Sequence, residues 1–254
     1  MILYGKPVAE KIYKKLKFGK PLALAVVLIG EDPVNLAYVH AKEKKAKRFG
    51  VKFRLFHLPG IASERQISEL INNLNRNKFI NGIIVQLPLP ESIDTEKILR
   101  LISPEKDIDG FSGDFTAPTA QAILEILEFY EINFQNKKIV IVGYGRLVGK
   151  PLADLLRKKG AQPIICTSNS DIATETTDAD IIISATGTAS LIKSEMVSEK
   201  AVVIDAGTAE SHGKIRGDVD PLIFKKVRAY TPTPGGVGPV TVACLMRNLV
   251  EAAG

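Results

Sequence analysis

The sequence has few of the residues that build disulfide frameworks or metal sites. It contains two cysteines and three histidines in 254 residues. Cys166 and Cys244 stand alone in apolar segments, so we expect reduced thiols in the core. The histidines do not have the spacing of metal ligands, and we therefore expect no protein-bound metal.

Long apolar runs are also absent. No run approaches the ~18 residues that indicate a membrane span, and the first residues lack the basic-then-apolar order of a signal peptide. Hydrophobic residues make up 45% of the chain and charged residues 24%, which is typical of soluble globular proteins. The sequence therefore predicts a cytoplasmic protein with no membrane partner.

Acidic charge is outweighed by basic charge, with a formal net charge of +6. The basic residues are densest at 41–48, which reads AKEKKAKR. This run has a helical pattern, is broken by Glu43 and has no interleaved aromatic residues for base stacking. We expect a solvated helix face, or one that attracts a polyanionic small molecule, and no nucleic-acid partner.

Apolar strand-like runs are present in number, and they alternate with helical stretches. They lie at residues 22–29, 51–58, 82–87, 138–143, 162–166, 180–187, 201–207 and 227–231. Near-continuous Val/Ile runs are typical of parallel strands covered on both faces. Residues 110–119 are rich in Gly, Pro and polar residues and resemble a linker. We expect two α/β domains with a cleft between them, the second with a Rossmann-like parallel sheet.

The second half carries a glycine-rich turn, Gly143–Gly149, between an apolar strand and a helix. Such a turn lets the backbone approach a pyrophosphate, and the helix N-terminus favours an anion. The spacing is one residue longer than the usual fingerprint, and a plain strand-to-helix turn can look the same. The strand–helix units that follow favour dinucleotide binding.

The end of the next strand bears on which dinucleotide binds. Residues 166–170 read CTSNS, and Ser168 and Asn169 would admit a 2′-phosphate with Arg146 as its charged partner. Asp171 either serves as the ribose carboxylate or caps the following helix. The pattern favours NADP and leaves NAD as the alternative.

Polar residues of the first half form a second candidate site. Tyr38 and Lys42 are four apart and share one face of a predicted helix, although such a pair is usually an ordinary amphipathic surface. Gln86 ends an apolar strand, where α/β sites collect side chains. Asp107 and Asp109 follow in a segment that also reads as a turn.

The run TPTPGGVGPVT at 231–241 is uncharged and has a restricted path. Two interpretations are open: the run is a loop that closely approaches a planar or anionic ligand, or it is an ordinary connection into a helix at 242–253. It also resembles a signature of a folate enzyme family. Further motifs of the same family precede this run and occur in the family's order along the chain: YVHAKEKKA, VQLPLP, DIDGF, IVGYGRLVGKPLADLL, IIISATG, VIDAG and GDVD.

Over nearly its whole length the chain is similar to the bifunctional methylenetetrahydrofolate dehydrogenase/cyclohydrolases. The resemblance implies oxidation of 5,10-methylenetetrahydrofolate with NADP, then hydrolysis of the methenyl product to 10-formyltetrahydrofolate in one-carbon metabolism. It implies tetrahydrofolate derivatives as substrates and a homodimer. It also implies a folate-binding catalytic domain at 1–114, with the helix 240–254 packing back on it, and a Rossmann-like NADP-binding domain at 115–239.

The resemblance also assigns roles to residues. Lys42 would move protons, Tyr38 would stack on the folate, Gln86 would hydrogen-bond Lys42, and Asp109 would bind the pterin. The implied substrate-binding residues are Tyr38, Gln86, Leu87, Pro88, Asp109, Pro234, Gly235 and Gly236. The implied cofactor-binding residues are Gly143, Tyr144, Gly145, Arg146, Val148, Gly149, Ser168, Ala185, Thr186, Gly187, Gly207 and Thr208.

Three alternatives stay open. Tyr144 and Gly145 stand where the family commonly has Arg-Ser, which leaves NADP against NAD undecided. A monofunctional NAD(P)-linked dehydrogenase would need no Lys42. A non-catalytic nucleotide-binding protein would leave the first-half residues unexplained.

Overall fold

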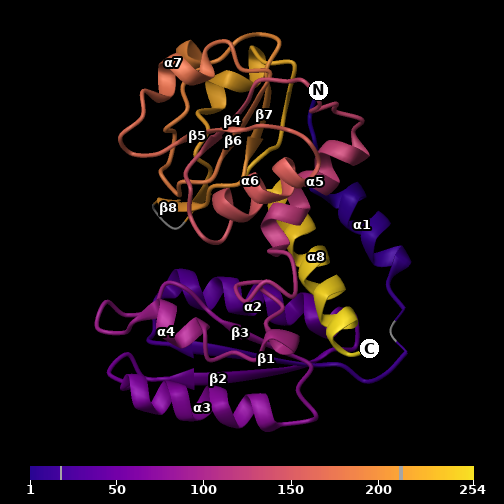
Figure 1. Ribbon diagram of the computed structural model, residues 1–254, viewed down its shortest axis with the longest axis vertical. Coiled ribbons are helices and arrows are strands. Elements are labelled where there is room, and N and C mark those ends of the chain that lie inside the picture. Colours follow the sequence, from indigo (N-terminus) through magenta and orange to yellow (C-terminus); the bar gives the residue numbers. More distant parts are fainter. Residues whose placement is uncertain (18, 212–213) are drawn as a thin grey trace. The chain divides into compact units, whose positions relative to one another are not determined.

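The computed structural model describes residues 1–17, 19–211 and 214–254 (Figure 1). The chain divides into two compact units. One, the five-stranded unit, comprises Met1–Lys14 and Thr119–Cys244, and the other, the three-stranded unit, comprises Lys15–Pro118 and Leu245–Gly254. Each is an α/β structure built on a parallel sheet, which confirms the expected fold class. The functional domain boundaries and the cleft stay predictions.

The three-stranded unit has the strand order β2-β1-β3, with β1 at Ala23–Ile29, β2 at Lys52–Leu58 and β3 at Gly82–Val85. The central strand β1 is buried along its whole length, as its unbroken apolar sequence requires, whereas the edge strand β2 is partly exposed. Helices α2 (Pro33–Arg48) and α3 (Glu64–Arg76) lie on opposite sides of the sheet (Figure 1). The two helices cover opposite faces because the right-handed connections from β1 to β2 and from β2 to β3 run in opposite directions across the sheet.

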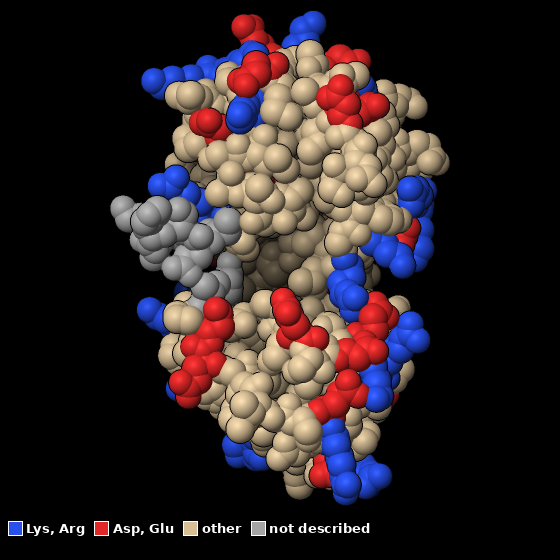
Figure 2. Space-filling view, turned by 90° about the vertical axis from the view of Figure 1, so that its left-hand side faces the viewer, with Lys and Arg blue, Asp and Glu red and all other residues tan. Residues whose placement is uncertain are grey.

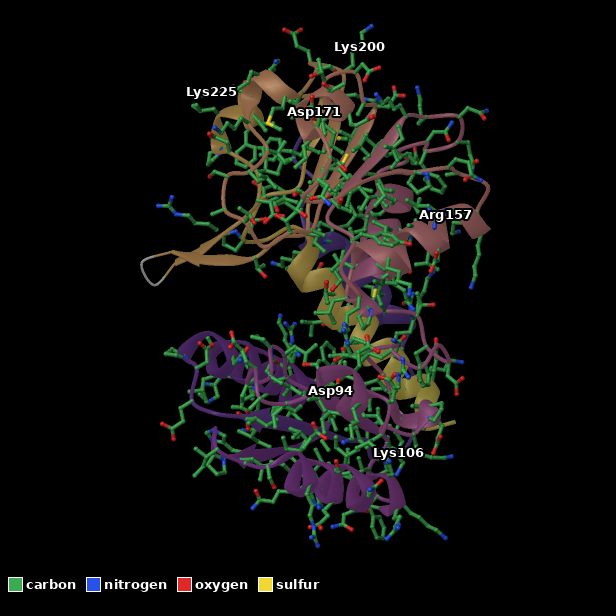
Figure 3. All side chains as sticks on the ribbon, turned by 60° about the vertical axis from the view of Figure 1, so that its left-hand side comes forward. Asp94, Lys106, Arg157, Asp171, Lys200 and Lys225 are labelled. Carbon is green, nitrogen blue, oxygen red and sulfur yellow. The ribbon has the colours of Figure 1, made fainter. Side chains whose placement is uncertain are left out.

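Local signals fix the ends of these helices. The Asp32 carboxylate accepts a hydrogen bond of 2.8 Å from the backbone N–H of Asn35 and caps α2, with Pro33 as its first residue. Gly50 follows α2 with φ +69°, and its N–H bonds to the carbonyl of Lys47, which ends the helix. Lys106 closes α3 by donating to the carbonyls of Leu74, Asn75 and Asn77 (Figure 3).

Two short helices complete the path to the expected linker. They are α4 (Thr95–Leu99) and the 3-10 turn η1 (Pro104–Lys106). Residues 110–117 are irregular, as expected, but they are anchored. Asn248 of α8 (Val237–Ala252), buried in the three-stranded unit, donates from Nδ2 to the carbonyls of Ile108 (2.9 Å) and Thr116 (3.0 Å).

The five-stranded unit has the order β10-β7-β6-β4-β5. Counted along the chain from β4, this order is 2-1-3-4-5, a doubly wound arrangement whose direction reverses between β4 and β6. The strands are β4 (Ile139–Val142), β5 (Ile164–Cys166), β6 (Ile181–Ser184), β7 (Val202–Asp205) and β10 (Ala229–Tyr230). The helices are α1 (Gly5–Lys15), α5 (Pro118–Phe129), α6 (Gly149–Lys158) and α7 (Ile172–Thr176), with 3-10 turns η2 (Ser194–Met196) and η3 (Pro221–Lys225).

Two elements differ from the sequence prediction. The antiparallel pair β8 (Ala209–Ser211) and β9 (Lys214–Arg216) was not expected. The last helix was expected from Val242 but begins at Val237, inside the Pro/Gly run. Pro239 lies in its first turn, where a backbone N–H has no partner within the helix, so this proline does not interrupt it.

Charged side chains are mixed on the face seen in Figure 2, where basic and acidic groups alternate with wide uncharged areas. Among the described residues, no helix is both long and apolar enough to cross a membrane. The same part of the chain contains no group of three or more His, Cys, Asp or Glu side chains that could hold a metal ion.

Candidate active site

A lysine and a glutamine meet where β3 ends. Lys42, on α2, donates from Nζ to Oε1 of Gln86 at 3.1 Å. Gln86 directly follows β3 and is 8% exposed, while Lys42 is half-buried. The two residues are 44 apart in the sequence, and the parallel pairing of β1 with β3 brings their elements together. The predicted contact between Lys42 and Gln86 is present.

The amide of Gln86 is held on its other side too. Its Nε2 donates to Oδ1 of Asn35 at 3.3 Å and to the carbonyl of Leu87 at 2.9 Å. Asn35 is buried in the first turn of α2. Because Nε2 donates to these two acceptors, Oε1 is the atom that faces Lys42, and it accepts the hydrogen bond from the lysine. Asn35 was not among the predicted site residues, because a polar residue three positions after a helix cap looks like an ordinary residue of the first turn.

Asp109 shares an electrostatic environment with Lys42. Burial raises the pKa of Asp109; the Lys42 charge opposes this shift, and Asp107 adds to it. Burial disfavours the charged form of Asp109, and the nearby lysine charge favours it. Tyr38 lies on α2 one turn before Lys42, but its side chain falls outside the part of the structure that is described.

Asp107 has a structural role. It is fully buried, and its Oδ2 accepts a hydrogen bond of 2.6 Å from the N–H of Ser112, so it organises the turn that follows Asp109. Gly110, within that turn, has φ +78°, and an added Cβ would lie 2.5 Å from the carbonyl oxygen of Phe115. The turn interpretation therefore holds for Asp107.

The glycine-rich turn lies at the carboxyl end of β4, where the strand order reverses. Gly143 has φ +97°, and a Cβ there would lie 2.6 Å from the carbonyl oxygen of Ala185. A Cβ on Gly149 would lie 1.9 Å from the carbonyl oxygen of Gly143. Gly145 is open, with nothing within 4 Å of an added Cβ. The N-terminus of α6 has no side-chain cap among the described residues, and it can therefore bind a phosphate group.

The segment after β5 contains Asp171, the acid considered above as a ribose carboxylate. Asp171 caps α7, accepting from the backbone N–H of Thr174 at 3.2 Å and from its hydroxyl at 2.8 Å (Figure 3). The Thr174 hydroxyl bond is the main reason that the pKa of Asp171 is lowered. Ser168 and Asn169 are exposed at the strand end. Of the two roles left open for Asp171, the structure supports the cap.

Tyr144 interacts with the helix that follows the turn. A hydrogen bond with the Tyr144 side chain raises the pKa of Arg157, which lies on α6 (Figure 3). Tyr144 remains 40% exposed. Arg146 is exposed in the same turn.

The remaining predicted residues lie on loops of the five-stranded unit. Ala185, Thr186 and Gly187 follow β6, and the N–H of Ala185 bonds to the carbonyl of Val142 at 2.8 Å, beside the glycine turn. Gly207 and Thr208 follow β7. These loops and the glycine turn lie at the carboxyl ends of neighbouring strands, where such sheets bind ligands.

The predicted folate-binding residues are divided between the units. Lys42, Gln86, Leu87, Pro88 and Asp109 belong to the three-stranded unit, and Pro234–Gly236 belong to the five-stranded unit. Leu87–Pro88 and Thr233–Pro234 are cis peptide bonds. Gly235 accepts from the N–H of Gly5 at 2.9 Å, and a Cβ on Gly5 would lie 1.8 Å from the carbonyl oxygen of Gly236. The Pro/Gly segment is thus packed tightly against the start of α1.

Together, the doubly wound sheet, the glycine turn at its reversal point and the hydrogen-bonded Lys–Gln pair define a dinucleotide-binding α/β enzyme. Two family models cover almost the whole chain. The tetrahydrofolate dehydrogenase/cyclohydrolase catalytic domain matches residues 3–109, and the NAD(P)-binding domain of the same family matches residues 117–254. The chain belongs to the tetrahydrofolate dehydrogenase/cyclohydrolase family.

Individual relatives agree with this assignment. The chain is 40% identical over 275 residues to the bifunctional protein FolD of Aquifex aeolicus, covering 99% of this chain and 94% of that protein. The crystal structure of the bifunctional FolD enzyme from Campylobacter jejuni is similar, with a TM-score of 0.93, 36% identity and coverage of 100% and 98%. The Trypanosoma brucei FolD complexed with NADP and an inhibitor has a TM-score of 0.90 at 29% identity, with coverage of 98% and 94%.

The expected family, the two-activity class of enzyme and the NAD(P) cofactor are confirmed. The roles of individual site residues, the homodimer, the exclusion of nucleic acid and the cytoplasmic location stay predictions.

Proposed function

We propose that the chain oxidises 5,10-methylenetetrahydrofolate with NADP and then hydrolyses the methenyl product to 10-formyltetrahydrofolate. The observation that carries the proposal is the hydrogen bond from Lys42 to Gln86, oriented by the buried Asn35. A dehydrogenase step alone would need no lysine held at the end of β3. The pair therefore supports retained cyclohydrolase activity over the monofunctional alternative.

The hydrolytic step needs a group that moves protons. Water adds to the carbon between N5 and N10 of the methenyl cation and loses a proton. The resulting hydroxyl then loses its proton as the bond from this carbon to N5 breaks, N5 takes up a proton, and the formyl group remains on N10, so that one proton is released overall. Lys42 would transfer the proton from the oxygen to N5, because Gln86 holds its Nζ in place.

The oxidative step needs orientation more than acid–base chemistry, since the cation forms without a protein nucleophile. Gly143 and Gly149 form a turn that only glycine fits, and this turn with the N-terminus of α6 would hold the pyrophosphate. When bound, NADP supplies the hydride acceptor. Ser168 and Arg146 would contact the 2′-phosphate, and Ala185–Gly187, Gly207 and Thr208 would border the remainder.

We assign substrate orientation to the substrate-binding residues that the family resemblance implies. Asp109 would accept hydrogen bonds from the amino edge of the pterin, a contact that an analogue without those N–H groups would lose. Its proximity to the Lys42 charge supports this placement. Tyr38 would stack on the folate, and Leu87, Pro88 and Pro234–Gly236 would supply apolar and backbone contacts.

Substitution of Lys42 tests the proposal. Lys42→Met keeps the length of the side chain and removes the amine. We expect hydrolysis of methenyltetrahydrofolate to fall by at least ~100-fold, the scale of a lost acid–base group, while cofactor reduction persists. Both rates are measured by absorbance on the same preparation.

Lys44→Met is the matched control, because Lys44 is exposed on the same helix. It removes the same charge and should leave both rates near their original values. Equal retention of both activities in Lys42→Met would refute the role given to Lys42.

A homodimer in the cytoplasm, with no nucleic-acid partner, is the assembly and location that we propose. The mixture of acidic and basic side chains on the face in Figure 2 supports the exclusion of nucleic acid, since a phosphate backbone favours a continuous basic stripe.

A further inference from the structure

Two buried carboxylates in the five-stranded unit take no part in the proposed reaction. Asp205 ends β7 and is 3% exposed, and Asp218 follows β9 and is completely buried. Buried carboxylates lower stability unless they are well hydrogen-bonded. Burial raises the pKa of Asp205 to about 6. The contacts of the two carboxylates indicate what role they have.

Asp218 holds the loop that follows β6. Its Oδ2 accepts from the backbone N–H of Thr186 at 2.7 Å, from the Thr186 hydroxyl at 2.9 Å and from the hydroxyl of Ser184 at 2.8 Å. The Thr186 hydroxyl oxygen in turn accepts from the N–H of Thr188 at 3.1 Å. One buried carboxylate thus orders an exposed segment, residues 186–188, through two consecutive hydrogen bonds.

Asp205 fixes the position of Asp218. Its Oδ1 accepts from the N–H of Asp218 and from the N–H of Gly207, each at 3.1 Å, and its Oδ2 accepts from the N–H of Val219 at 3.4 Å. Thr231, at the end of β10, accepts from the N–H of Asp205 at 2.8 Å through its hydroxyl oxygen. The ends of β6, β7 and β10 are therefore linked through these two acids.

Glycine backbone packs closely against both carboxylates. A Cβ on Gly207 would lie 1.9 Å from Oδ1 of Asp218, and a Cβ on Gly217 would lie 1.7 Å from Oδ2 of Asp205. Backbone is pressed against each acid where any other residue would collide. Oδ1 of Asp218 nevertheless has no hydrogen-bond partner among the described residues, so the group is not optimised for stability alone.

We propose that Asp218 is a positioning residue for the nicotinamide cofactor, acting through Thr186 to order the Ala185–Thr188 loop, with Asp205 holding Asp218 in place. The inference rests on the proposed function, which assigns Ala185, Thr186 and Gly187 to the cofactor. The loop lies beside the glycine turn, because Ala185 bonds to Val142 and its carbonyl lies against Gly143. A disordered loop would have to be ordered at each binding event, and this would weaken affinity.

Titration with NADPH, followed by its fluorescence and without folate, measures binding apart from turnover. Asp218→Asn keeps the volume and removes the charge. We expect the Kd for NADPH to rise roughly tenfold or more, the scale of a lost charge-assisted hydrogen bond. The KM for NADP should rise with it, whereas hydrolysis of added methenyltetrahydrofolate, which uses the three-stranded unit, should be little affected.

Ser184→Ala is the matched control. It removes a hydrogen bond to the same oxygen of Asp218 but leaves both Thr186 bonds in place. Its Kd for NADPH should stay within about twofold of the original protein, even if the thermal midpoint falls. A lower midpoint with an unchanged Kd in Asp218→Asn would mean a merely structural role and overturn the inference.

If Asp218→Asn does not fold, Thr186→Val tests the same inference, since it removes the hydrogen bond from the Thr186 hydroxyl to Asp218. It should raise the Kd for NADPH, and an unchanged value would overturn the inference. Where both variants fold, the double variant should bind no more weakly than the weaker single one, because both break the same link. Failure of the unsubstituted protein to bind NADPH would instead contradict the proposed function.

Discussion

At the scale of residues, the site depends on polar groups that end apolar strands. Gln86 and Asp205 both follow this pattern. Only Gln86 was predicted from this signal. The same signal would have found Asp205. Asp218 lies in the GDVD motif, but the motif does not reveal its contacts with Asp205 and Thr186, which the fold creates. Asn35 carries no local signal, since its partner Gln86 is 51 residues away.

Ser168 gives a prediction about cofactor choice. It is exposed at the end of β5, where related sheets place the carboxylate that binds a ribose hydroxyl. Ser168→Asp would set a negative charge against the 2′-phosphate. We expect the ratio of kcat/KM for NADP over NAD to fall at least ~10-fold.

Ser168→Ala is the control for this change, because it removes the hydroxyl without adding charge. It should shift the ratio far less than Ser168→Asp does. Equal ratios in the two variants would mean that the 2′-phosphate is bound elsewhere, with Arg146 as the next residue to test.

At the scale of elements, most strands of the two parallel sheets were predictable. Continuous apolar runs marked the buried strands β1, β3, β4, β6 and β7, because burial on both faces leaves no place for alternation. The strands β8 and β9 are only three residues long each and gave no strand signal. The early start of α8 was missed because Gly and Pro were taken as loop formers, although proline is suited to a first helical turn.

Helix α8 stabilises the segment that carries Asp109. Asn248→Ala removes the donor to the carbonyls of Ile108 and Thr116 in a buried site. We expect the free energy of unfolding to fall by about 2 kcal/mol. The KM for the folate substrate should also rise more than the KM for NADP, since Asp109 directly follows Ile108. Denaturant unfolding and steady-state kinetics measure the two effects.

Glu251→Ala on the same helix serves as the control, because Glu251 is exposed. Its effect on unfolding should stay within about 0.5 kcal/mol. A similar rise in both KM values for Asn248→Ala would contradict a specific link between α8 and the folate-binding segment.

At the scale of the whole molecule, the chain consists of two compact units, each built on a parallel sheet. The three-stranded unit carries the Lys42–Gln86 pair and Asp109, and the five-stranded unit carries the glycine turn and the loop held by Asp218. The alternation of strands and helices predicted two α/β domains. It did not predict that Met1–Lys14 would join the second sheet, where Ile2 pairs with Tyr230, because such long-range pairing has no local signal.

The most direct test of two activities in one chain supplies 5,10-methylenetetrahydrofolate with NADP, and in parallel with NAD. Reduced cofactor and methenyltetrahydrofolate are followed together by absorbance. We predict that NADP is reduced faster than NAD and that no methenyl species accumulates, because Lys42 supports its hydrolysis. Accumulation of the methenyl species to the level of reduced cofactor would contradict the cyclohydrolase activity, and no reduction of either cofactor would contradict the whole account.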